Sequence, residues 1–79
     1  MPQLVLDRGL TANYGPGQVP GVLQIIGVGA SYTIAIAGAP ATAHVIAPSA
    51  ADSYPIDGQA VTVVNTSAAA GPPNLTLSY

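Results

Sequence analysis

The chain has 79 residues, no cysteine, one histidine (His44) and four charged side chains, with a net charge of −2. A single arginine cannot neutralise the phosphates of a nucleic acid or bind an anionic membrane, and the lack of cysteine excludes disulfides and thiolate zinc sites. A domain of this size has a small core, and the remaining way to support it is association with other chains. We therefore expect a homo-oligomer without a metal or other cofactor.

The first twenty residues are expected to differ from the rest of the chain. The segment "TANYGPGQVPG" contains too much glycine and proline for regular structure, although "QLVL" before it could form a short strand. We therefore predict an N-terminal arm over residues 1–20, which reaches another chain, and a compact β body over residues 21–79. Asp7 and Arg8 interrupt the apolar run of a secretory signal peptide, so we expect a protein that is not secreted.

The body is predicted to be all-β. Five runs are bounded by turn residues and either alternate or are rich in β-branched side chains: "GVLQIIG", "SYTIAIAG", "TAHVIAP", "QAVTVVN" and "NLTLSY". Asp57 and Gly58 suit a tight turn before the fourth run. Short strands at these spacings predict a small β-sandwich or barrel of about five to six short strands, with an extended N-terminal arm and almost no helix.

The uncharged window from Val19 to Ala37 needs a test as a membrane span. Proline and several glycines interrupt it, and its flanks lack the lysines and arginines that anchor a spanning helix. Strands and turns whose outward faces hold small or hydroxyl side chains explain the missing charge better. A small membrane protein is the third-ranked reading of this sequence.

Residues that could support catalysis are few and lie apart in the sequence. His44 is predicted on a strand, on the face opposite Val45, as a structural or interface histidine. Asp52 and Asp57 fit loop capping and turn initiation better than a cation site, which would need more oxygen ligands. No nucleophile elbow or phosphate-binding loop is present, so we expect no enzyme activity.

Three tyrosines are candidates for contact with a partner. Tyr14 and Tyr54 lie in segments rich in proline and glycine, and Tyr79 is the last residue printed. A tyrosine in a loop is a common anchor of protein interfaces, but it can equally pack over the edge of its own domain. The sequence leaves both alternatives open.

The arm-like "MPQLVLDRGLTANYGPG" and the body "GVLQIIG…SYTIAIAG…QAVTVVN…NLTLSY" resemble, in size and style, the small decoration or cement proteins of tailed-phage capsids. The resemblance implies a protein of the virion, made in the host cytoplasm, that stabilises the shell as a homotrimer or between neighbouring major capsid subunits. It implies no catalytic residue. The interface candidates under this resemblance are Leu4, Leu6, Tyr14, Tyr54 and Tyr79.

A second structural role is compatible with the same features. A tail, fibre or spike module that works by structure or adhesion would also be small, uncharged and rich in short strands. The two roles differ in what they need: a decoration protein should purify alone and add back to a stripped capsid, whereas a fibre module should require its flanking chain.

Overall fold

The computed structural model describes residues 3–27, 30–46, 51–67 and 74–79. These residues form strands and turns without any helix, and so contain no helix long and apolar enough to cross a membrane. The predicted all-β class is therefore confirmed. The strands are β1 (Gln3–Leu6), β2 (Thr11–Tyr14), β3 (Val22–Ile26), β4 (Ser31–Ile36), β5 (Thr42–Val45), β6 (Ala51–Pro55), β7 (Val61–Asn65) and β8 (Leu75–Ser78).

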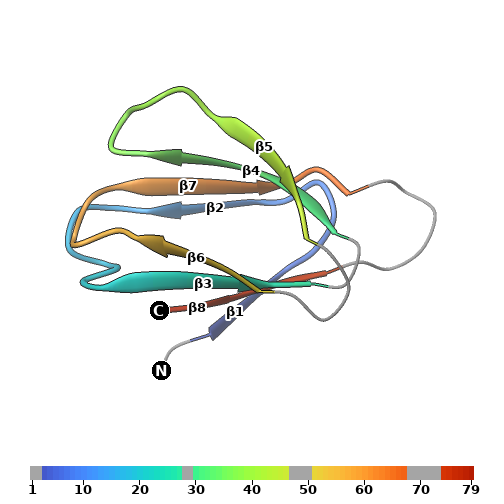
Figure 1. Ribbon diagram of the computed structural model, residues 1–79, viewed down its shortest axis with the longest axis horizontal. Coiled ribbons are helices and arrows are strands. Elements are labelled where there is room, and N and C mark those ends of the chain that lie inside the picture. Colours follow the sequence, from blue (N-terminus) through green and yellow to red (C-terminus); the bar gives the residue numbers. More distant parts are fainter. Residues whose placement is uncertain (1–2, 28–29, 47–50, 68–73) are drawn as a thin grey trace.

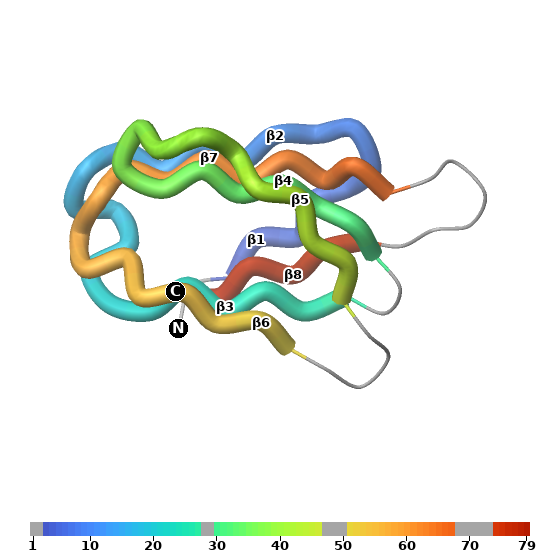
Figure 2. The backbone as a smooth tube through the Cα atoms, turned by 45° about the horizontal axis from the view of Figure 1, so that its top comes forward, coloured from blue at the N-terminus to red at the C-terminus, as the bar shows by residue number. Residues whose placement is uncertain are grey.

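The strands form two four-stranded antiparallel sheets that pack face to face (Figures 1 and 2). Sheet A has the order β1-β8-β3-β6, and sheet B has the order β2-β7-β4-β5. Strands of the first half of the chain pair with their mirror images in the second half: β1 with β8, β2 with β7, β3 with β6 and β4 with β5. The chain is thus one long hairpin rolled up on itself, which is the eight-stranded jelly roll.

The core lies between the two sheets and follows from the alternation of side chains along each strand. In β4, Tyr32 and Ile34 point inward, and in β3 Leu23 and Ile25 do the same from the other sheet. Covering these inward faces removes apolar surface from water, which is the main favourable contribution to folding. The most deeply buried large side chains are Tyr32, Leu23, Ile25, Ile46, Ile56, Leu75, Leu77, Val19, Val61 and Val63.

The expected N-terminal arm over residues 1–20 is wrong for the part that the structure describes. β1 pairs with β8 in sheet A and β2 pairs with β7 in sheet B, so residues 3–14 belong to the body. The glycine- and proline-rich stretch is the β2–β3 connection. It is held by Gly17 N, which donates to Gly58 O at 2.8 Å, and by Gly58 N, which donates to Val19 O at 2.8 Å. A boundary at residue 20 therefore does not divide this fold.

Two tight turns have the backbone geometry that twisted antiparallel strands favour. Asp57 and Gly58 both have positive φ (52° and 79°), and Gln59 N donates to Ile56 O at 3.0 Å, which confirms the predicted turn. Ala37 and Gly38 repeat the pattern between β4 and β5 (φ 55° and 77°). Glycine takes this conformation without steric cost, whereas an alanine there is uncommon.

A buried amide joins the end of β7 to the β1–β2 connection. Asn65 Nδ2 donates to Leu6 O at 2.8 Å, and its Oδ1 accepts from Ser67 N at 3.0 Å. The Asn65 backbone pairs with Gly9 N and Leu10 O on the same connection. The side chain is completely buried, and these bonds satisfy polar groups that would otherwise be costly to bury.

Candidate functional site

A polar cluster joins the two sheets on the β5–β6 side of the sandwich. The Tyr32 hydroxyl, which comes from β4, donates a hydrogen bond to Asp52 Oδ2 on β6. The Tyr54 hydroxyl, also on β6, lies 2.5 Å from the Tyr32 oxygen. Because the Tyr32 proton is directed to the carboxylate, Tyr54 donates to Tyr32. Asp52 is therefore an acceptor within the sandwich, and its predicted role in capping a loop is wrong.

His44 completes the cluster from β5. Its ring stacks on Tyr32, with centroids 5.5 Å apart and planes at 28°, and meets Tyr54 edge-on at 6.0 Å and 61°. Its Nε2 atom shares a hydrogen bond of 2.9 Å with Thr42 Oγ1. As predicted, His44 lies on the strand face opposite Val45, which is exposed. Its contacts hold β5 against β4 and β6.

Electrostatics keep the Tyr32 phenol protonated. Burial raises the pKa of Tyr32 far above the usual value near 10, and the hydrogen bonds with Asp52 and Tyr54 raise this pKa further. A phenol with so high a pKa acts as a hydrogen-bond donor, not as a base or nucleophile. Over the described part of the chain no pocket opens, and no group of acidic, histidine or cysteine side chains is arranged to hold a metal ion.

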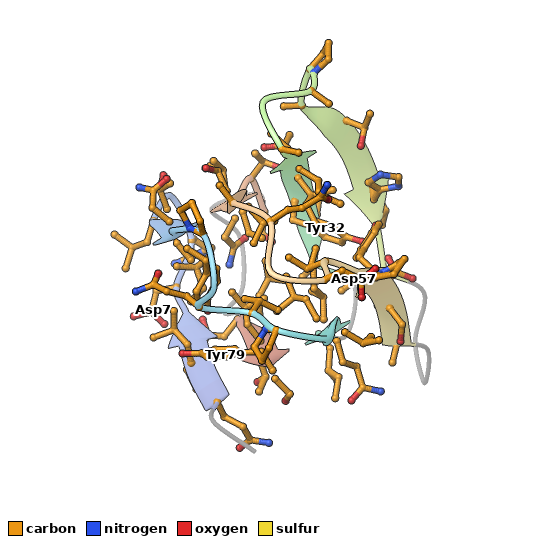
Figure 3. All side chains as sticks on the ribbon, turned by 90° about the vertical axis from the view of Figure 1, so that its left-hand side faces the viewer. Asp7, Tyr32, Asp57 and Tyr79 are labelled. Carbon is orange, nitrogen blue, oxygen red and sulfur yellow. The ribbon has the colours of Figure 1, made fainter. Side chains whose placement is uncertain are left out.

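The tyrosines and leucines predicted as interface residues occupy different environments. Leu6 and Tyr14 are buried in the core, and Leu4, on the edge strand β1, is exposed. Tyr14 and Tyr54 lie on strands rather than in loops, and Tyr79 packs edge-on against Tyr14 at 4.8 Å. Figure 3 shows Tyr79 on the β1 side and Tyr32 on the β5 side of the sandwich. Leu6 and Tyr14 therefore serve the core of their own domain.

The hydroxyl of Tyr14 contrasts with that of Tyr32. It is buried and has no hydrogen-bond partner within the described residues. Burial raises the pKa of Tyr14 to about 12, and the neighbouring Tyr79 phenol contributes a smaller part of the increase. An ionised Tyr14 would have to be buried without a partner, so the protonated form is strongly favoured.

The outer faces of both sheets are free of charged side chains in the described residues. Asp7 and Arg8 lie in the β1–β2 connection, Asp57 lies in the β6–β7 turn, and Asp52 points inward. Partners across sheet A share a face, so its register gives the outward residues: Gln3, Val5, Val22, Gln24, Ile26, Ala51, Ser53, Pro55, Thr76 and Ser78. The outer face of sheet B consists mainly of threonine, alanine and valine.

The apolar part of the outer face of sheet A was not among the predicted interface residues, although the sequence contains a signal for it. The segment "VLQII" in β3 places apolar side chains on both of its faces, with Leu23 and Ile25 inward and Val22 and Ile26 outward. A strand that is apolar on both faces is typical of a sheet covered on both sides. Here no second layer lies over the outward face within the described chain.

Comparison with protein-family models finds no match, and comparisons with curated proteins and with solved structures find none either.

Proposed function

We propose that this protein is a virion structural protein that decorates a capsid shell and stabilises it by binding between major capsid subunits. The supporting observation is that both broad outer faces of the sandwich lack charge, while the four charged side chains lie in turns or inside. The buried centre of a protein interface is depleted in charged residues, whereas a freely exposed surface normally has many. Faces of this kind suit a protein that is covered by neighbours.

The fold adds support by analogy. Jelly rolls occur in viral capsid proteins, and also in lectins and cupins. A shared architecture does not by itself define a function, so this support is weaker than that from the surface. Because residues 3–14 belong to the sandwich, we expect the sheet faces and turns, and not an N-terminal arm, to contact the shell. A trimer is the assembly that the resemblance to decoration proteins implies.

The role is tested by adding the purified chain to capsids stripped of their small surface proteins. We expect saturable binding by co-sedimentation and a rise in the temperature at which the shells break. Because the faces have no charge, raising the salt concentration from 0.05 to about 0.5 M should weaken binding only slightly. Folded protein that binds no shell, but associates with a tail or fibre preparation, would replace this proposal with the tail, fibre or spike role.

A further inference from the structure

We propose that the outer face of sheet A binds the same face of a second copy, giving a weak dimer with twofold symmetry. This inference rests on the proposed structural role, because it assigns one of the two uncharged faces to a particular partner. Two sheets that pack face to face form the same kind of layer as the two sheets within the domain. A twofold contact uses one patch on both copies, so that patch must be complementary to itself.

Exposed apolar side chains are more frequent on the outer face of sheet A than on that of sheet B. Val5, Val22 and Ile26 are 59%, 52% and 40% exposed, and all three lie on the outer face of sheet A. They are half of the large apolar side chains exposed in the described residues, whereas Val45, 72% exposed, is the one such side chain on the outer face of sheet B. Val22 and Ile26 lie at opposite ends of β3, with Gln24 between them, so a partner that covered the whole face would remove both apolar ends from water.

A row of neutral polar side chains crosses sheet A. The register places Gln3 beside Ser78, Ser78 beside Gln24, and Gln24 beside Ser53. Ser78 is only 4% exposed between the two glutamines, so the members that a partner can reach are Gln3, Gln24 and Ser53. Within the row, Gln3 Nε2 donates to Ser78 Oγ at 3.4 Å. Amides and hydroxyls each donate and accept hydrogen bonds, so a row of them can pair with a copy of itself. A charged row would instead require a partner of opposite charge.

The size of the face sets the expected strength. Four strands about 4.8 Å apart, with four or five residues each, form a face smaller than the roughly 800 Å² per partner of a standard interface. We therefore expect dissociation in the micromolar range or weaker. Such a dimer forms only at high concentration or where a larger assembly holds two copies close together.

The test compares two nearly isosteric substitutions that each add one negative charge. Gln24→Glu places the charge at the middle residue of β3, in the outer face of sheet A, so a dimer would bring two copies of it together. Asn13→Asp adds the same charge to the outer face of sheet B and keeps the oxygen that accepts from Thr62. Sedimentation from about 10 µM to 1 mM should show dimers for wild type and Asn13→Asp, with at least tenfold weaker association for Gln24→Glu.

A second matched pair locates the contact on the sheet. Val22→Lys should also weaken the dimer at least tenfold, whereas Val45→Lys, on sheet B, should not; both side chains are more than half exposed, so both variants should fold. A monomer at 1 mM, or an oligomer that is lost only in the sheet B variants, would overturn the inference. A monomer that still binds capsids would leave the proposed function standing. A dimer that binds no capsid would refute that function and leave the sheet A contact intact.

Discussion

Two tyrosine pairs span the sandwich at its two sides and differ in what surrounds their hydroxyls. Tyr14 and Tyr79 meet edge-on at 4.8 Å on the β1–β2 side, and Tyr32 and Tyr54 meet edge-on at 6.4 Å on the β5–β6 side. Each pair links sheet B to sheet A. Tyr32 has a carboxylate acceptor, whereas the Tyr14 hydroxyl is buried and has no hydrogen-bond partner among the residues that the structure describes. Burying a tyrosine is expected to cost less where its hydroxyl has a hydrogen-bond partner, so the two pairs should differ in their contribution to stability.

Removing the Tyr32 hydroxyl should have the largest effect. Tyr32→Phe leaves the Asp52 carboxylate and the Tyr54 hydroxyl without their shared partner, and we expect a loss of about 2 kcal/mol in the free energy of unfolding. Urea unfolding followed by circular dichroism measures it. Asp52→Asn, which keeps an acceptor oxygen, is the control and should lose less. A loss below about 0.5 kcal/mol for Tyr32→Phe would show that the cluster contributes little to stability.

Alkaline pH should weaken the fold through both pairs. An unfolded tyrosine loses its proton near pH 10, whereas folded Tyr14 keeps it until about pH 12 and folded Tyr32 keeps it to a still higher pH. The unfolded state therefore binds fewer protons above pH 10, and the free energy of unfolding falls as pH rises. The contribution is fully present below pH 10. Urea midpoints measured from pH 9 to 12 should decline.

The tyrosine variants test the origin of this decline. Tyr14→Phe and Tyr32→Phe should each make the fall in the urea midpoint between pH 10 and 12 shallower, since each removes one group whose pKa differs between the folded and unfolded states. Slopes identical to that of the wild type would mean that other groups cause the alkaline loss.

Removing the Tyr14 hydroxyl should raise the free energy of unfolding, whereas removing the Tyr32 hydroxyl should lower it. Tyr14→Phe deletes a buried polar atom that has no partner in the described structure and keeps the ring packed on Tyr79, so we expect a gain of about 1 kcal/mol at neutral pH. Thermal unfolding at pH 7 measures it. Tyr79→Phe, at a half-buried side chain, should change stability little. A destabilised Tyr14→Phe variant would indicate that this hydroxyl does find a partner.

The smallest effect is expected at Tyr54. Tyr54→Phe removes one hydrogen bond, but the Tyr32 hydroxyl still donates to Asp52, so the loss should be about 0.5 kcal/mol. Combining it with Tyr32→Phe should cost less than the sum of the two single losses, because both substitutions remove the same bond. Strict additivity in this double-mutant cycle would contradict the coupling of the two phenols.

The sequence predicts the strands of this fold better than their arrangement. All four central strands, β8, β3, β7 and β4, match predicted runs, because strands with neighbours on both edges show strong alternation or β-branched content. The two missed strands, β2 and β6, lie at sheet edges. β6 ends in Pro55, and an edge strand tolerates proline because one side of its backbone makes no ladder hydrogen bonds. Their turn-rich flanks are typical of loops, so the sequence predicts five to six strands where the described residues form eight.

The polar cluster could not be predicted for a different reason. Asp52, Tyr54 and His44 follow local patterns that are typical of turns and strands, and nothing local places them beside Tyr32. They meet because β6 and β5 are the edge strands of opposite sheets on the same side of the sandwich. That proximity is a property of the jelly-roll pairing, which joins segments far apart in the chain.

The central place of β8 in sheet A has a consequence for synthesis on the ribosome. β8 is the last of the eight strands to be translated, yet it lies between β1 and β3, and Gln3 pairs with Ser78 across a separation of 75 residues. β3 can find β6 and β4 can find β5 earlier, but β1 has no sheet neighbour until β8 emerges. Closing such distant pairs is entropically costly, and all-β folds of this kind form in roughly milliseconds to seconds. Until β8 has been translated, β1 therefore remains an unpaired, uncharged strand, which exposes the nascent chain to aggregation.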